Sequence, residues 1–282
     1  MTWTFEPLTA GLMVVSAGIY ALGLRAAWQQ GGAGTGFRPW HVAAFYSGMV
    51  ALAVALMSPL AWLSDLLFSA HMTQHEVLML VAAPLLVFGQ PLLAMLWAVP
   101  PGRRTGLIRA VRRRSVMSAW LWLTTPLVVF LLHGLALWIW HIPALFEWAL
   151  HNEAVHAVQH LSFVGTAALF WWGMVHGRYG RAAYGVGLLY VFLTAVHSTI
   201  LGALLTVAPS TWYRSYEATA AQRHVNALAD QQLAGLVMWV PSGVIFIVIG
   251  LALAAAWLGE SERRVLLGST SQSRTRGAGD GI

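Results

Sequence analysis

Long apolar segments, separated by short polar loops, follow one another along almost the whole chain. Seven of them reach the length of about 20 residues that a helix needs to cross a bilayer. The predicted spans are 8–28, 39–57, 65–88, 117–138, 153–175, 182–207 and 230–258. The third apolar segment runs on toward residue 99, but Pro84, Gly89 and Pro91 interrupt it. We therefore expect a short interfacial or re-entrant segment at 91–99, and an all-α membrane bundle of seven helices overall.

The composition agrees with this pattern. The chain is 58% hydrophobic and only 9% charged, whereas a soluble domain carries about 25% charged residues. Residues 1–258 are expected to form one transmembrane domain, and the Ser-, Gly- and Arg-rich segment 259–282 a disordered tail. No basic residue precedes the first apolar segment, so we expect a retained helix there rather than a secretory signal peptide.

The arginines predict how the bundle is oriented. All 16 basic residues are arginines, and with the N-terminus outside only two of them, Arg214 and Arg223, lie on the outer side. The other fourteen (16 minus 2) lie inside, together with the C-terminus, which is the positive-inside pattern. We expect a multi-pass protein of the bacterial cytoplasmic (inner) membrane. The basic residues then record orientation and contact with membrane lipid, and no nucleic-acid partner is expected.

Two pairs of histidines, each four residues apart, lie within apolar segments. His71 and His75 belong to the third predicted span, and His156 and His160 to the fifth. On a helix this spacing places both imidazoles of a pair on one face. Ionisable groups are rare in membrane helices unless they face an interior or serve a function. The two pairs are therefore the main candidate site.

The predicted orientation also places the pairs at similar depths. Both helices begin at the outer face, and a rise of about 1.5 Å per residue puts the four histidines about 5–15 Å below the helix starts. Met79 extends the stripe of His71 and His75 by one further turn. Other candidate ligands in the outer half are His133, His141, His197, Met79, Met238 and Asp230. Met79 and Met238 would equally suit core packing, and Asp230 would suit a helix cap.

These residue types point to a metal. Imidazole is the commonest metal ligand in proteins, and His with Met suits copper in either oxidation state. Zinc and iron also accept imidazole, while the absence of cysteine removes thiolate sites. Candidates to orient the rings are Glu76, Gln74, Gln159 and Asp230. The segment 71–75 lacks the glutamate that follows the first histidine of zinc peptidases, so no such enzyme is expected.

Several stretches together resemble the polytopic CtaG family of cytochrome c oxidase assembly factors. They are residues 71–84, which begin with HMTQH, 138–145 (WIWHIPAL), 156–163 (HAVQHLSF), 201–206 (LGALLT) and 230–241 (DQQLAGLVMWVP). The last of these stretches is quite specific to the family, whereas the histidine pairs alone would not identify it. The resemblance covers most of the chain between residues 40 and 258. One departure is Glu76, which stands where the family pattern leads us to expect an apolar residue.

The resemblance implies an assembly factor, not an enzyme, for a haem-copper oxidase. Such a protein would bind copper, as Cu(I) or Cu(II), and deliver it to the copper B centre of the oxidase large subunit. Its partners would be that subunit and a periplasmic copper donor. Two other functions remain compatible with the histidines. One is a bis-His haem-binding redox protein, and the other is a copper transporter, which would need polar groups continuing through the inner half.

Overall fold

The computed structural model describes residues 7–31, 36–176 and 183–277, with side chains described except at 183 and 261–277. Arg178 and Arg181, which the orientation argument uses, lie outside the described residues, as does the end of the tail from 278. All regular structure in the described ranges is helical. The elements are α1 (Pro7–Gly31), α2 (Pro39–Met57), α3 (Pro59–Ser64), α4 (Phe68–Glu76), η1 (Val77–Ala82), α5 (Ala83–Phe88), α6 (Pro91–Ala98), α7 (Pro101–Val111), α8 (Arg114–Leu123), α9 (Pro126–Trp140), α10 (Pro143–His151), α11 (Glu153–His176), α12 (Ala183–Val207), α13 (Arg214–Gln222) and α14 (Ala227–Gly277).

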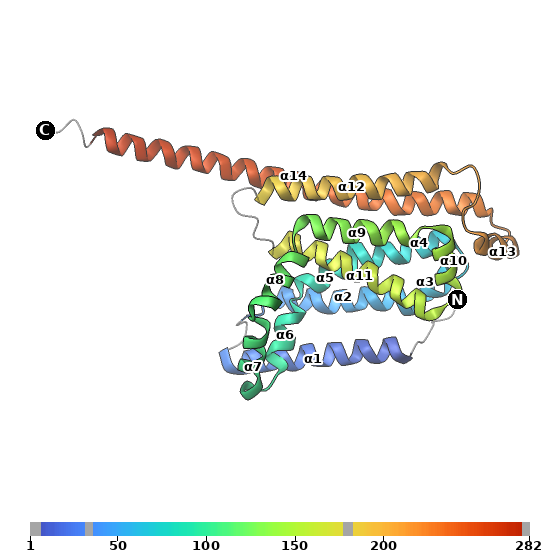
Figure 1. The fold of residues 1–282 in the computed structure, drawn as a ribbon, viewed down its shortest axis with the longest axis horizontal. Helices are drawn as coiled ribbons and strands as arrows, with labels where there is room; N and C mark the ends of the chain where they lie inside the picture. Colours follow the sequence, from blue (N-terminus) through green and yellow to red (C-terminus); the bar gives the residue numbers. More distant parts are fainter. Residues whose placement is uncertain (1–6, 32–35, 177–182, 278–282) are drawn as a thin grey trace.

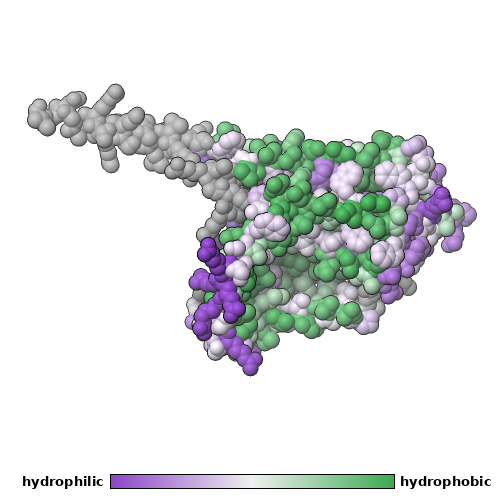
Figure 2. All heavy atoms as spheres, viewed as in Figure 1, coloured by the Kyte–Doolittle hydropathy of each residue, from purple (hydrophilic) through white to green (hydrophobic). Residues whose placement is uncertain are grey.

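Several of these helices are long and apolar enough to cross a membrane. Among the described residues there are five: Pro7–Gly31, Pro39–Met57, Phe68–Phe88, Tyr184–Val207 and Ala227–Glu260. The pair α8 and α9 makes a sixth if it is counted as one broken span. Apolar side chains cover the flank of the bundle, and hydrophilic ones gather at its two ends (Figure 2). These features indicate a multi-pass membrane protein, while the count of seven spans stays a prediction because α11 is not among those six.

The fourth predicted span, 117–138, is not one straight helix. α8 and α9 meet at an angle of 61°. Pro126 begins α9, and the preceding Thr125 is extended at φ −67° and ψ 142°. Proline lacks an N–H and its ring disfavours a helical conformation in the residue before it, so the chain turns at this point.

The third predicted span is continuous from Phe68 to Phe88, as α4, the π-helix η1 and α5. It then breaks at Gln90, which has the left-handed φ of 55°, and α6 follows at Pro91. The segment expected at 91–99 is thus a separate short helix, and its interfacial or re-entrant placement stays a prediction. α6 packs on α1 (Figure 1). The approach is so close that a Cβ added to Gly23 would lie 1.9 Å from the carbonyl oxygen of Ala94.

The last helix, α14, runs beside α12 and then continues to Gly277 (Figure 1). The sequence predicts a disordered tail from residue 259, and the structure differs by extending the helix through that segment. Glu, Arg and Leu, which dominate residues 260–267, are good helix formers and account for the continuation.

The helices that carry the histidine pairs lie in the middle of the bundle. α4 and α11 share one apolar core with α9, α12 and α14. α10 and α13 lie at one end of this core, and the arginine-rich α7 lies at the other end (Figure 1). Any chemistry of the histidine pairs is therefore enclosed by helices on several sides.

Candidate metal centre

The four paired histidines converge between α4 and α11. The ring centroid of His71 lies 4.4 Å from that of His75 and 5.4 Å from that of His156. The ring of His160 lies 5.2 Å from His75 and 4.2 Å from His156. Ligand nitrogens of His71, His156 and His160 all lie within 4.8 Å of one another. Metal–nitrogen bonds of about 2.0 Å place the ligands of one ion within about 4 Å of each other, so small ring rotations suffice.

The cluster is largely shielded from solvent. His71 is 0% exposed and His75 is 2% exposed, while the α11 pair is half-buried. Phe146 of α10 packs against His71 at 5.1 Å, and Phe163 of α11 packs against His75 at 4.7 Å between ring centroids. Helical spacing explains the arrangement, since each i, i+4 pair presents two rings to the facing helix.

Several nitrogens of the cluster have no hydrogen-bond partner among the described residues. They are Nε2 of His71 and His160 and both ring nitrogens of His75, all of them buried. The side-chain amide of Gln159, between the α11 histidines, is likewise buried and unpartnered at both of its polar atoms. Burying a polar atom without a partner costs about 1–3 kcal/mol. A coordinated cation would satisfy the one lone-pair nitrogen that each of these neutral imidazoles has.

Tyr216 of α13 orients one ring of the cluster. Its hydroxyl donates to the carbonyl of Ser64 at 2.8 Å and lies 3.0 Å from Nδ1 of His71. Burial raises the pKa of Tyr216 well above its usual value, and Asp65 and Asp230 raise it further, so the hydroxyl stays protonated. Because its one proton goes to Ser64, the oxygen accepts from Nδ1–H of His71. This fixes the tautomer that leaves the His71 Nε2 lone pair directed at the cluster.

His141, at the C-terminal end of α9, lies beside the cluster. Its ring is 6.3 Å from both Phe146 and Phe163, the two rings that flank the histidine pairs. Its Nδ1 is 2.7 Å from the carbonyl oxygen of Leu137, and its Nε2 is 3.5 Å from the Sδ of Met72. The sequence predicts His141 as a further ligand, but it gives no reason to single out Met72.

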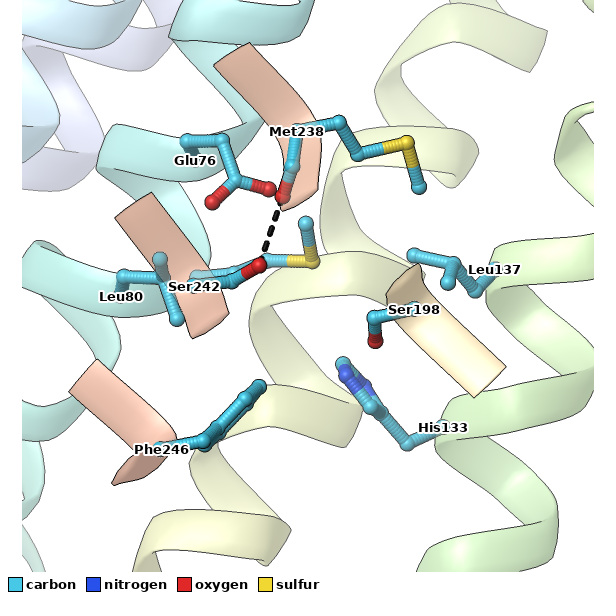
Figure 3. A pocket seen from close by; sticks show the side chains of 9 residues that line it. Glu76, Leu80, His133, Leu137, Ser198, Met238, Ser242 and Phe246 are labelled. Atoms are coloured by element: carbon cyan, nitrogen blue, oxygen red, sulfur yellow. Dashed lines mark hydrogen bonds between the residues drawn. The ribbon is translucent and has the colours of Figure 1, made fainter. Parts of the chain in front are cut away.

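Other predicted ligands line a separate cavity. Its free volume is about 20 Å³, room for about one water molecule. Figure 3 shows Glu76 and Met238 on one side of this space and His133 on the other. The lining residues are Glu76, Met79, Leu80, His133, Leu137, Ser198, Met238, Ser242 and Phe246. None of the four paired histidines belongs to that lining, which Met79, Met238 and His133 share. A role for these three as ligands stays a prediction.

His133 and His197 form a small group of their own. Nδ1 of His133 lies 3.1 Å from the hydroxyl of Thr166. The His197 ring lies 6.2 Å from the His133 ring. Both nitrogens of His197 are buried without a hydrogen-bond partner among the described residues. The histidines predicted for the metal site thus fall into the four-histidine cluster, the neighbouring His141, and the pair His133 and His197.

Asp230 acts on the backbone of α4 and not on a histidine. Its carboxylate accepts from the N–H of Phe68 at 2.7 Å and from the N–H and hydroxyl of Ser69. The sequence predicts a ligand, a ring-orienting group or a cap of its own helix, and the structure instead has α14 cap α4. Gln74, another predicted ring-orienting residue, donates to the carbonyl of Ala55 at 2.8 Å and anchors α2.

Comparison with known proteins identifies the family of the chain. Residues 18–260 match the sequence model of the cytochrome c oxidase caa3 assembly factor family, Caa3_CtaG. The chain belongs to this family. The predicted resemblance is thereby confirmed.

Curated relatives include uncharacterized proteins of Mycobacterium bovis and Mycobacterium tuberculosis, each 26% identical over 275 residues. A further one, from Mycobacterium leprae, is 24% identical over 268 residues. Each match covers 93% of this chain but 40% of the relative, so the chain spans about two fifths of their length. No solved structure matches the chain.

Proposed function

We propose that this member of the caa3 assembly factor family binds copper at His71, His75, His156 and His160 and delivers it to the copper B centre of the oxidase large subunit. The observation that carries the proposal is the convergence of these four imidazoles, with buried nitrogens of His71, His75 and His160 left unpartnered. Neutral imidazoles suit a copper ion, and no thiolate competes in a chain without cysteine.

The position of the cluster suits delivery on the outer side. In the proposed orientation the N-terminus lies outside and seven spans cross the inner membrane. The cluster contacts α10 and α13, at the end of the bundle opposite the arginine-rich α7 (Figure 1). Arginines concentrate on the inner side of membrane proteins, so the cluster lies near the outer, periplasmic face. A periplasmic donor loads copper there.

Unequal burial of the two pairs gives the transfer a direction. His71 and His75 are almost completely buried, while His156 and His160 are half-buried. Copper therefore exchanges on the side of α11, where ligands of the donor or the oxidase displace the two half-buried imidazoles first. The α4 pair, held by Tyr216 and by the Asp230 cap, keeps its geometry during exchange.

Metal analysis of protein purified without chelator tests the proposal, with X-ray absorption to count nitrogen ligands. The His71→Ala/His75→Ala double variant should lose tightly bound copper while keeping its helical content. A matched control is His151→Ala/His224→Ala, two exposed histidines away from the cluster, which should retain copper. Stoichiometric copper in the His71→Ala/His75→Ala protein would refute the site, and a haem absorption band in the wild type would refute the copper function.

A further inference from the structure

A second pair of potential ligands lies next to the four-histidine cluster. Nε2 of His141 and Sδ of Met72 are 3.5 Å apart, and the two residues come from different elements, the end of α9 and α4. Both are buried, with His141 4% exposed and Met72 1% exposed. Met72 directly follows His71 in the sequence, so the pair adjoins the cluster without belonging to it.

The two facing atoms are both acceptors. Nδ1 of His141 lies 2.7 Å from the carbonyl oxygen of Leu137, and a carbonyl can only accept, so Nδ1 carries the proton. In neutral imidazole the other nitrogen then has a lone pair and no hydrogen. A thioether sulfur has no hydrogen to donate either. The contact between His141 and Met72 is therefore not a hydrogen bond, and it leaves a lone pair on each of the two atoms available to a cation.

The spacing suits a metal ion. With bonds of about 2.0 Å to nitrogen and about 2.3 Å to sulfur, two ligands 3.5 Å apart subtend an angle of about 110° at the metal. That is close to the tetrahedral angle. A thioether is a soft ligand that favours Cu(I) over harder divalent ions. Phe146 and Phe163 lie near His141 as they lie near the cluster, and the burial of His141 and Met72 shields this position from solvent.

We propose that Met72 and His141 form a second, Cu(I)-selective position beside the four-histidine cluster. The inference rests on the proposed function in taking copper as the metal, but it concerns a different set of ligands. Cu(I) at this position is bound by one nitrogen and one sulfur of the chain. The cluster, by contrast, supplies nitrogen only, so the two positions have different X-ray absorption signatures.

The test is anaerobic titration of the purified full-length protein with Cu(I) against a chromophoric competitor, followed by X-ray absorption of the loaded protein. Wild type should show a sulfur scatterer at about 2.3 Å in addition to nitrogen. Met72→Leu, which conserves volume in the core, should lose that sulfur signal and bind one Cu(I) fewer. Met95→Leu, at a 42% exposed methionine of α6, is the matched control and should behave as wild type.

The variants separate this inference from the proposed function. His71→Ala/His75→Ala should lose the nitrogen-only copper and keep the sulfur-bound Cu(I). If that double variant binds as much Cu(I) as wild type while Met72→Leu binds less, the four-histidine function fails and the Met72 position stands. Absence of sulfur scattering in wild type, or its persistence in Met72→Leu, would overturn the second position.

Discussion

The carboxylate of Asp230 accepts the backbone N–H of Phe68 at 2.7 Å, although the two residues are 162 positions apart in the sequence. Phe68 is the first residue of α4, and Leu67, the residue before it, provides no side-chain cap. The first N–H groups of a helix lack partners within the helix, and negative charge there is favourable. α14 thus holds in place the helix that carries His71 and His75 one to two turns further on.

Removing this cap should destabilise the protein. Asp230→Ala leaves the N–H groups of Phe68 and Ser69 without their acceptor in a buried position, which costs about 1–3 kcal/mol. Thermal unfolding in detergent, followed by circular dichroism, should show a lowered midpoint. Asp230→Asn keeps one acceptor oxygen, so its thermal midpoint should fall less than that of Asp230→Ala. Midpoints equal to wild type for both variants would contradict the capping role.

Tyr216→Phe should weaken copper binding without unfolding the bundle. The variant removes the hydroxyl that accepts from Nδ1–H of His71 and so frees the ring to change tautomer or rotate. Loss of a group that orients a metal ligand costs about 10–100-fold in affinity. Competition titration with a copper chelator measures the change.

Tyr213→Phe is the matched control for this effect. Its hydroxyl donates to the backbone carbonyl of His141 at 3.0 Å, and no contact joins it to the four paired rings. Its loss should affect copper affinity less than tenfold. Equal weakening in the two variants would show that the aromatic packing at this end, and not the orientation of His71, sets the affinity.

Much of this architecture follows from local patterns. Apolar length predicts the long helices, and the spacing of His71 with His75 and of His156 with His160 predicts that each pair shares a helix face. Pro126, a helix-breaking residue, lies within the fourth apolar segment, yet the length of that segment alone favours one continuous span. Composition therefore predicts which segments are helical better than it predicts where they bend.

The contacts between distant segments could not be predicted in this way. No periodicity connects Tyr216 with His71 or Asp230 with Phe68, because the three-dimensional packing of α13 and α14 brings them together. Depth alone also grouped Met79, Met238 and His133 with the paired histidines. In the structure these three line a cavity whose lining includes none of the paired histidines. Residues at one depth can face different neighbours, because depth carries no information on rotation about the helix axis.

Glu76→Leu should stabilise the protein and leave copper bound. The Oε2 atom of Glu76 is buried with no hydrogen-bond partner among the described residues, and the side chain lines the cavity next to Met79 and Met238. Replacing an unsatisfied buried polar group by an apolar one gains about 1–3 kcal/mol. The thermal midpoint should rise, with copper stoichiometry unchanged. Loss of copper would instead place Glu76 among the groups that hold the metal.

The close contact between α12 and α14 predicts that a larger side chain at this contact lowers the stability of the protein. A Cβ at Gly235 would lie 2.4 Å from the Thr206 hydroxyl oxygen and 2.6 Å from the carbonyl oxygen of Gly202. Small residues let membrane helices approach closely, so Gly235→Ala must push α12 and α14 apart. Overpacking of this kind costs about 1–3 kcal/mol. Gly243→Ala, in the same helix with no atom within 4 Å of the added Cβ, is the matched control.

The expected outcome is a lower thermal midpoint for Gly235→Ala and an unchanged one for Gly243→Ala. Because Asp230 caps α4 from the beginning of α14, displacement of α14 should also weaken copper binding at His71 and His75. A Gly235→Ala protein that is destabilised yet binds copper with wild-type affinity would show that the cap tolerates movement of α14. A protein with unchanged stability would show that the two helices are not in the close contact described.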